Sequence, residues 1–370
     1  MKTKIFINAR FLTQSITGVQ RYGEELIYAF DALIDSQQIE RERYEWIMLA
    51  PPNLKRKLRV KHIQLHVVGK LTGHLWEQIE LPFYAANGLL VNLGNTAPIL
   101  KRNQVVAIHD AAVKRHPEAF SFWFRNLYNV LFHILTRTSK LIITNSNFSK
   151  SELIGCFRVK ESKIRVSYLG CEHIERIEKN DNIIKTYGLQ YKRYILAVSS
   201  MNPLKNFQLI QTAIHLLQDF NIYVVIAGME NSRIFEDSYL EPNNRMIYVG
   251  YVNEQELRSL YENATCFVYP SKYEGFGLPP LEAMSMGCPV ILSTAASLPE
   301  VYGESVLYCD PNDSYSLVKQ LIKIYSDENL KKQLIQEGID HAKSFRWQTC
   351  AQQVFAAIEE VLKDECGSRP

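Results

Sequence analysis

The sequence predicts an α/β protein built from two doubly wound domains. Strand-like runs recur every 20 to 40 residues along the chain, with helix-period stretches between them. This alternation indicates parallel sheets that are covered by helices. The runs form two series separated by a polar stretch at residues 172–182, and 370 residues suit two domains of ordinary size.

Hydrophobic periodicity predicts the individual strands and helices. The first series of predicted strands covers residues 4–10, 44–50, 62–68, 89–95, 104–110, 141–146 and 164–168. The second series covers 194–200, 222–228, 246–252, 266–271, 289–294 and 305–309. Helix-period patterns cover 20–35, 122–136, 206–218, 254–263, 314–326 and 347–364. Asn253 and Glu256 predict an N-cap and capping box for the helix at 254–263.

These patterns predict a first domain at residues 1–175 and a second at 176–346. The amphipathic segment at 347–370 is expected to pack back on the first domain. Ligands of doubly wound sheets bind at the carboxyl ends of the strands, so we expect the site in a cleft between two facing domains.

Composition narrows the class of protein. Hydrophobic residues make up 46% of the chain and charged residues 22%, and no apolar run has the length that spanning a bilayer needs. The N-terminus enters a strand-like run directly, without a leader pattern, which predicts a cytoplasmic protein. The seven cysteines are scattered and lack C-x-x-C spacing, which favours reduced, buried thiols over disulfides or a metal cluster.

The net charge of the chain is small, but its two halves carry charge of opposite sign. Residues 1–175 contain 24 Lys and Arg against 15 Asp and Glu, so the remainder contains 42 − 24 = 18 against 39 − 15 = 24. The densest basic cluster is Lys55–Lys61. Two interpretations stay open: a solvated loop, or a site for an anionic lipid surface or an acceptor phosphate.

Residues 274–282 (EGFGLPPLE) are the most informative segment. They lie between the predicted strands 266–271 and 289–294, and Pro279 and Pro280 start a helix there. A glycine-rich loop that ends at a helix N-terminus presents backbone N–H groups to a phosphate. Glu274 and Glu282 flank this loop and can reach hydroxyls beside the phosphate. The segment therefore predicts a nucleotide-sugar site.

Other candidate residues follow strands of both series. Lys205 lies in the turn after the strand at 194–200 and adds a cation for a diphosphate. His109 ends the strand at 104–110, where it can donate a hydrogen bond to a sugar hydroxyl. Gly18 and Arg21 lie at the turn after the first strand, where amides can face the acceptor or the phosphate.

Six segments resemble the retaining glycosyltransferases of family four, which have the two-domain GT-B architecture. The segments are GVQRY (18–22), IHDAA (108–112), TNSNFSKSEL (144–153), VSSMNPLKN (198–206), FVYPSKYEGFGLPPLEAMSMGCPVI (267–291) and SLPEVYGESVLYCDP (297–311). The resemblance implies two Rossmann-like domains facing across a cleft, the first binding the acceptor and the second the nucleotide sugar.

The resemblance also implies roles for individual residues. Glu274 matches the residue that contacts hydroxyls of the donor sugar, and Glu282 the one that holds the ribose. Lys205 matches the lysine that binds the diphosphate, and His109 the histidine near the reacting carbon. The resemblance further implies that the backbone amides of the loop contact the sugar and the phosphate: Gly275, Phe276, Gly277 and Leu278. It implies that the strand end at Gly250 and Val252 binds the base.

One departure from the family concerns the leaving group. Relatives often have an arginine on the same turn as the lysine, where this chain has Ser200 or Leu204. Arg233 and Arg21 are the candidates for a substitute cation. A second departure is Tyr168, where many relatives have proline.

The resemblance implies retaining transfer of a mannose-like hexosyl unit from a nucleotide-diphosphate sugar to a growing glycan. GDP-mannose is the expected donor because residues 199–206 and 295–301 resemble mannosyl- and rhamnosyltransferases. The expected acceptor is a lipid-linked cell-surface polysaccharide such as O-antigen. We expect no cofactor, no metal and no nucleic-acid partner, and the chain contains no Asp-x-Asp triplet.

Three other functions stay open. A sugar-nucleotide epimerase or hydrolase would share the fold, and a non-catalytic nucleotide-sugar-binding module would fit the missing arginine. A nicotinamide-dependent enzyme is less favoured because no G-x-G-x-x-G follows the first strand.

The aromatic run at residues 120–124 also has two interpretations. With the basic first domain it can dock on the inner face of the cell membrane. Alternatively, these aromatics are core residues of the helix that follows His109.

Overall fold

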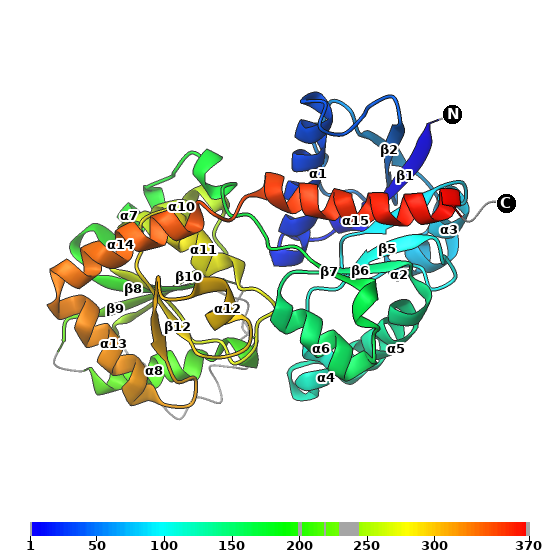
Figure 1. Ribbon diagram of the computed structural model, residues 1–370. Coiled ribbons are helices and arrows are strands. Elements are labelled where there is room, and N and C mark those ends of the chain that lie inside the picture. Colours follow the sequence, from blue (N-terminus) through cyan, green and yellow to red (C-terminus); the bar gives the residue numbers. More distant parts are fainter. Residues whose placement is uncertain (1, 199–201, 218–219, 229–243, 368–370) are drawn as a thin grey trace. The chain divides into compact units, whose positions relative to one another are not determined.

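A computed structural model describes residues 2–198, 202–217, 220–228 and 244–367. The chain forms two compact units, Met1–Gly170 with Arg346–Pro370, and Cys171–Phe345. Each unit contains one parallel sheet with helices on both faces (Figure 1). The predicted α/β class with two doubly wound sheets is therefore confirmed.

The first division falls after Gly170, whereas the sequence predicted it after residue 175. Cys171 is buried in the second unit, where its backbone N–H donates to the carbonyl of Phe345 at 3.2 Å. Its thiol donates to the carbonyl of Ala342. These contacts tie the start of the polar stretch to the end of the second unit. The second division falls after Phe345, one residue before the expected boundary.

The first unit has a seven-stranded sheet of order β3-β2-β1-β4-β5-β6-β7, in which all pairs are parallel. Its strands are β1 (Thr3–Asn8), β2 (Tyr44–Ala50), β3 (Gln64–Val67), β4 (Leu89–Asn92), β5 (Gln104–Ala107), β6 (Leu141–Thr144) and β7 (Ile164–Val166). Its α-helices are α1 (Gly18–Asp35), α2 (Gly73–Leu75), α3 (Leu81–Tyr84), α4 (Ala112–Arg115), α5 (Phe122–Thr138), α6 (Asn147–Phe157) and α15 (Trp347–Gly367). A π-helical segment, Trp76–Glu80, joins α2 to α3.

Two core clusters share one face of this sheet. Phe6, Leu90 and Val106 point to that face because the strand register places them at equivalent positions. Trp76 and Leu81 pack over β1, β2 and β4, and side chains of α5 and α6 pack over β5 and β6.

The C-terminal helix α15 covers the opposite face beside α1 (Figure 1). The ring of Phe355 lies 5.5 Å from that of Tyr44 and 6.0 Å from that of Trp46. The hydroxyl of Ser167 donates to the carbonyl of Cys350 at 3.2 Å. The helix is therefore part of the core of the first unit.

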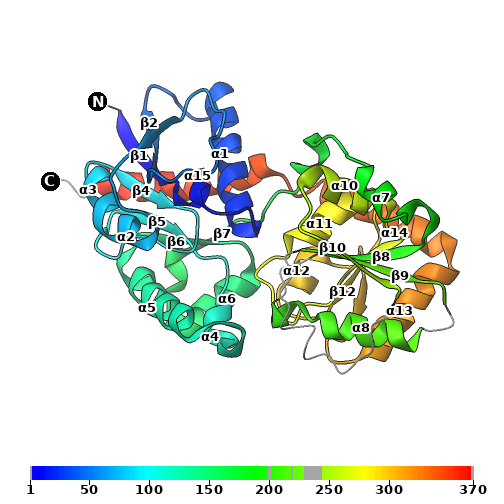
Figure 2. The ribbon, with the colours of Figure 1, turned by 180° about the vertical axis from the view of Figure 1, so that it is seen from behind.

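The second unit has a six-stranded parallel sheet of order β10-β9-β8-β11-β12-β13. Its strands are β8 (Tyr194–Val198), β9 (Tyr223–Ala227), β10 (Met246–Gly250), β11 (Cys266–Tyr269), β12 (Val290–Ser293) and β13 (Leu307–Cys309). Its described helices are α7 (Asn182–Thr186), α8 (Phe207–Leu216), α10 (Glu254–Asn263), α11 (Leu278–Ser285), α12 (Leu298–Tyr302), α13 (Ser314–Ser326) and α14 (Glu328–Ala342). Figure 2 shows α8 and α13 on one face, and α10, α11 and α14 on the other.

Several local predictions are confirmed. All thirteen predicted strands are present, mostly shorter at their carboxyl ends. Asn253 and Glu256 form the capping box of α10, with both hydrogen bonds at 3.0 Å. Five of the cysteines are buried: Cys171, Cys266, Cys288, Cys309 and Cys350.

The interpretation of the aromatic run 120–124 as core residues holds for Phe120, which packs against a core cluster, and is wrong for residues 122–124. Phe122, Trp123 and Phe124 are 60%, 81% and 40% exposed, because the first turns of α5 extend past the sheet core that its second half covers. Phe124 instead stacks on Phe120, which precedes α5, and on Tyr128 of the same helix, with ring centroids at 5.6 and 4.1 Å.

The basic cluster Lys55–Lys61 lies in a loop of the first unit. Arg56 donates to the carboxylate of Glu24 at 2.6 Å, and Lys61 pairs with Asp35 at 3.2 Å. Lys55, Lys57 and Arg59 are exposed. Among the described helices, none is both long and apolar enough to cross a membrane.

We predict that Ile358→Ala destabilises the first unit by about 2–5 kcal/mol, because the substitution leaves a cavity at a fully buried position of α15. All four tryptophans (46, 76, 123 and 347) belong to this unit, so tryptophan fluorescence during urea unfolding reports on it alone. Lys363→Ala, at an exposed position of the same helix, is the control. Equal unfolding midpoints for the two variants would contradict a core role for α15.

Candidate active site

The strand order of the second unit reverses between β8 and β11. The chain runs outward from β8 to β9 and β10, and then from β11 to β12 and β13 on the other side. The segments that follow β8 and β11 therefore leave in opposite directions, which opens a crevice at their carboxyl ends. Lys205 follows β8 and Glu274 follows β11, so the fold brings these two predicted residues to the same point.

Lys205 and Glu274 form an ion pair at this point. The ammonium donates to Oε1 of Glu274 at 2.5 Å and to the hydroxyl of Tyr269 at 2.8 Å. Their side chains are 21% and 11% exposed. Burial by itself would lower the pKa of Lys205, but the charge of Glu274 and the contact with Tyr269 outweigh it and raise that pKa. Lys205 is therefore a cation at every physiological pH.

The glycine-rich loop begins directly after Glu274 and ends at α11. The backbone carbonyl of Glu274 accepts from the hydroxyl of Ser297 at 3.0 Å. Gly277 has φ +85°, and a Cβ there would lie 2.9 Å from a methyl carbon of Leu298. Its carbonyl accepts from the Tyr302 hydroxyl. Only glycine suits this position, because both the backbone angle and the lack of space exclude a side chain.

The rest of the loop is buried. The aromatic ring of Phe276 packs at 6.0 Å from that of Phe345, and Leu278 is the first residue of α11. Gly275, Phe276, Gly277 and Leu278 thus lie where the positive end of the α11 dipole attracts an anion.

Glu282 lies one turn further along α11 and is buried. One of its carboxylate oxygens is 3.0 Å from Nε2 of His173, and the other accepts from the hydroxyl of Tyr261 at 3.0 Å. These partners hold the carboxylate in one orientation. Sequence patterns did not indicate either of them, because they come from segments 109 and 21 residues away.

The predicted base-binding residues lie at the edge of the sheet. Gly250 ends the edge strand β10 with φ +68°, next to an irregularity in the β9–β10 register. Val252 follows it and is half-buried. Two strands separate them from β11, the strand before the glycine-rich loop. Arg233 lies outside the described residues.

His109 is buried in the first unit, two residues after β5. Its ring lies edge-on to that of Tyr22 at 4.6 Å, and Nε2 is 3.2 Å from the carbonyl oxygen of Leu93. A carbonyl accepts, so the ring donates from Nε2 and Nδ1 carries the lone pair. Burial lowers the pKa of His109 to about 4, although the hydrogen bond to Leu93 opposes the shift. His109 is therefore neutral near pH 7.

Gly18 and Arg21 lie in the first turn of α1. Gly18 is exposed, and a Cβ there would meet no atom within 4 Å. The guanidinium of Arg21 is 3.4 Å from the carboxylate of Glu25 and 4.0 Å from that of Glu24. Arg21 is thus engaged with acidic side chains of its own helix.

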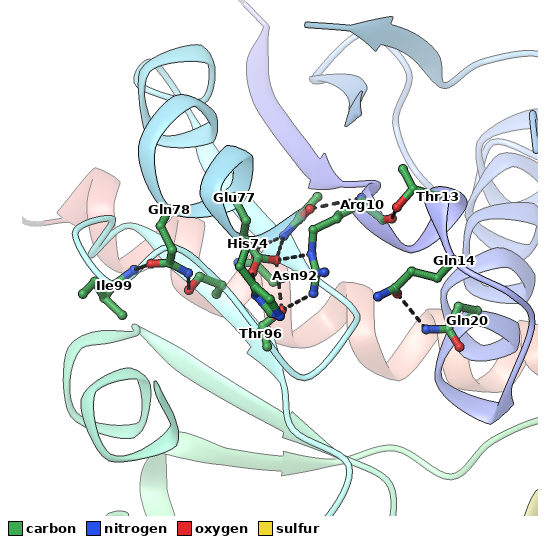
Figure 3. A network of polar contacts seen from close by, with 12 residues as sticks. Arg10, Thr13, Gln14, Gln20, His74, Glu77, Gln78, Asn92, Thr96 and Ile99 are labelled. Carbon is green, nitrogen blue, oxygen red and sulfur yellow. Dashed lines mark hydrogen bonds and ion pairs between the residues drawn. The ribbon is translucent and has the colours of Figure 1, made fainter. Parts of the chain in front are cut away.

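Sequence reasoning missed a polar network in the first unit, which Figure 3 shows. Arg10, His74, Glu77, Asn92 and Thr96 converge there from three separate stretches of the chain. The signals in the sequence were the polar residues Asn8 and Asn92 within the apolar predicted strands 4–10 and 89–95, and Arg10 at the end of the first. In the part of the chain that the structure describes, no group of His, Cys, Asp and Glu residues has the arrangement of a metal site.

Two doubly wound units of this kind define the GT-B class, and comparison with solved structures agrees. Sucrose-phosphate synthase from Thermosynechococcus elongatus superposes with a TM-score of 0.74 at 17% identity, covering 98% of this chain and 100% of that chain. WaaG, a glycosyltransferase of lipopolysaccharide biosynthesis, superposes with a TM-score of 0.70 at 13% identity, covering 95% and 98%. At these identities the likeness shows the fold.

Sequence comparison shows the family. The model of the glycosyl transferases group 1 matches residues 179–341. The O-antigen chain mannosyltransferase B of Escherichia coli is 34% identical over 268 residues, which cover 69% of this chain and 70% of that protein. The O-antigen chain mannosyltransferase RfbU of Salmonella typhimurium is 26% identical over 329 residues, covering 84% and 88%. The chain belongs to the group 1 glycosyltransferases and resembles bacterial mannosyltransferases.

We predict that His109 makes the first unit acid-sensitive. The folded protein protonates His109 only near pH 4, whereas the unfolded chain does so near pH 6.5. Stability therefore falls as pH falls from 6.5 to 4, by about 2 kcal/mol between pH 7 and pH 5. Urea unfolding followed by tryptophan fluorescence should show this loss in the wild type and a smaller one in His109→Gln. An identical pH dependence in both proteins would contradict it.

Proposed function

We propose that this glycosyltransferase moves a mannose-like hexosyl unit from a nucleotide-diphosphate sugar to a growing glycan, with retention of configuration and without a cofactor or metal ion. The observation that carries the proposal is the Lys205–Glu274 pair at the reversal point of the second sheet, directly before the glycine-rich loop and α11. A cation, helix amides and a carboxylate within one crevice match the charges and hydroxyls of such a donor.

The leaving diphosphate is the centre of the mechanism. As its bond to the anomeric carbon breaks, negative charge grows on the phosphate, and Lys205 with the amides of Gly275–Leu278 stabilises it. Glu274 and Tyr269 hold the ammonium in place before the donor arrives, so little reorganisation is needed. The carboxylate of Glu274 is also proposed to contact hydroxyls of the sugar.

Glu282 is proposed to hold the ribose. Its carboxylate is held in one orientation by His173 and Tyr261, and carboxylate oxygens are suitable acceptors for the hydroxyls of a diol. Gly250 and Val252 are proposed for the base, and His109 for the sugar near the reacting carbon. Among the described residues, Lys205 and the amides are the proposed leaving-group donors, because Arg21 is engaged with Glu24 and Glu25. Arg233, outside the described residues, stays a candidate for a further cation.

The proposed donor sugar and the proposed biosynthetic pathway are supported by the similarity to named relatives. Two of them are named as O-antigen mannosyltransferases, which supports GDP-mannose as donor and a surface polysaccharide as product. The proposed acceptor is a lipid-linked oligosaccharide at the cytoplasmic face of the membrane. The exposed aromatics of α5 (Phe122, Trp123 and Phe124) support a peripheral contact there.

The proposed function is tested by incubating the purified protein with GDP-mannose and an octyl mannoside acceptor. NMR of the product is expected to show an α-linked mannose, the configuration of the donor. Thermal-shift measurements with UDP-, GDP-, ADP- and dTDP-sugars identify the base. Free sugar or an epimer would indicate a hydrolase or epimerase instead, and binding without any transfer would indicate a non-catalytic module.

We predict that Lys205→Ala lowers the rate at saturating donor about a hundredfold or more, because a preorganised donor to the leaving group is lost. Initial rates of transfer measure this. Lys332→Ala, at an exposed position of α14, is the matched control and should keep the wild-type rate. An unchanged rate in Lys205→Ala would remove the leaving-group role.

We predict that the double substitution Phe122→Ser and Trp123→Ser weakens binding to anionic phospholipid vesicles about tenfold or more. Each aromatic ring that enters the bilayer interface contributes on the order of 1–2 kcal/mol of apolar transfer. Vesicle flotation measures the bound fraction. Tyr191→Ser, at an exposed aromatic of the second unit, is the control, and equal flotation of both variants would contradict the α5 contact.

A further inference from the structure

The sheet of the first unit also reverses its strand order once, between β1 and β4. Asn8 and Asn92 are the last residues of these strands and lie opposite each other in the register. The amide of Asn8 donates to the side-chain oxygen of Asn92 at 3.0 Å. Polar side chains therefore occupy the reversal point, which is where doubly wound sheets bind ligands.

Glu77 lies at the centre of this network (Figure 3). One carboxylate oxygen accepts from Asn8 at 2.8 Å, from Arg10 at 3.0 Å and from Thr96 at 2.9 Å. Burial would raise the pKa of Glu77, but hydrogen bonds from His74 and Asn8 and the charge of Arg10 lower it overall. Glu77 is thus a buried carboxylate ion that its partners hold in one orientation.

Stability alone does not account for this arrangement. A buried ion pair is often no more stable than apolar residues of the same volume. Glu77 also lies in the π-helical segment Trp76–Glu80, and such segments are rare and are found frequently at functional sites. The ion pair and the π-helix occur together at the reversal point of the sheet.

The second carboxylate oxygen of Glu77 faces His74. It is 3.3 Å from Nδ1 of the imidazole, and the His74 side chain is 37% exposed. A carboxylate accepts, so His74 donates from Nδ1, and the neutral ring carries its lone pair on Nε2. Tyr128 of α5 meets the imidazole edge-on at 6.2 Å, and Phe124 stacks on Tyr128.

We propose that His74, held by Glu77, binds a hydroxyl of the acceptor glycan in a subsite of the first unit. Nε2 accepts the hydrogen bond from the hydroxyl, and the ring of Tyr128 beside the imidazole suits the apolar C–H side of a pyranose. Arg10, Asn8 and Thr96 are positioning residues that act through Glu77. This inference rests on the proposed glycosyltransferase function and assigns its acceptor residue.

The test uses the full chain and a panel of octyl glycosides of α-mannose, α-rhamnose and β-N-acetylglucosamine. Ligand-observed NMR measures binding, and transfer from GDP-mannose gives KM and kcat. His74→Phe keeps the packing against Tyr128 and removes the hydrogen bond. Affinity for the preferred glycoside should fall about tenfold, with the acceptor KM rising by the same factor. His66→Phe, at an exposed histidine of β3, is the matched control.

His74→Gln distinguishes a hydrogen-bonding role from a structural one. Its amide supplies a hydrogen-bonding group on a side chain of similar reach, so it should recover part of the affinity that His74→Phe loses. Donor affinity, measured by thermal shift with GDP-mannose, should be unchanged in both variants. Glu77 is the wrong place for this test, because its replacement leaves Arg10 buried without a counter-charge.

Two results would overturn the subsite: no glycoside of the panel binds the wild type, or His74→Phe binds the preferred glycoside as well as the wild type does. A failure of the proposed function is a separate result. In that case, wild-type protein transfers no sugar from a nucleotide sugar to any glycoside, whatever the state of His74.

Discussion

The candidate chemistry of this protein depends on one topological constraint: each parallel sheet reverses its strand order once. Parallel strands put their carboxyl ends on one edge, and a reversal separates the two segments that leave neighbouring strands. In the second unit this point brings Lys205 beside Glu274. In the first unit it brings Asn8 beside Asn92, with Glu77 above them. Charged side chains therefore lie at the two positions where doubly wound sheets bind ligands.

The two ion pairs at these points differ in exposure, and this difference separates their proposed roles. Lys205 and Glu274 retain enough exposure to exchange partners with a donor, whereas Arg10 and Glu77 are almost completely buried. A buried pair cannot exchange with a substrate without a large desolvation penalty. The Arg10–Glu77 pair therefore acts through His74, the member of the network that reaches solvent.

The periodicity of hydrophobic residues and the positions of turn-forming residues predicted the strands, the capped helix α10 and the glycine-rich loop. These features depend on residues that are neighbours along the chain. Gly277 is an example, since a left-handed turn before Pro279 and Pro280 has a local signature. The same reasoning was wrong about Phe122–Phe124, because an apolar segment carries no information on whether a partner covers it. It also missed His173 and Tyr261, the distant partners of Glu282.

The sequence by itself determined the alternation of strands and helices, the family, and the segment from Glu274 to Glu282, because each is encoded within a short stretch. The tertiary structure decided which side chains meet. Arg10, His74, Glu77 and Thr96 come from segments that are far apart in sequence or have no common motif, and only the strand order brings them together. Hydrogen bonds between residues far apart in sequence produce no periodic pattern in the sequence, because they depend on how close the residues lie in space.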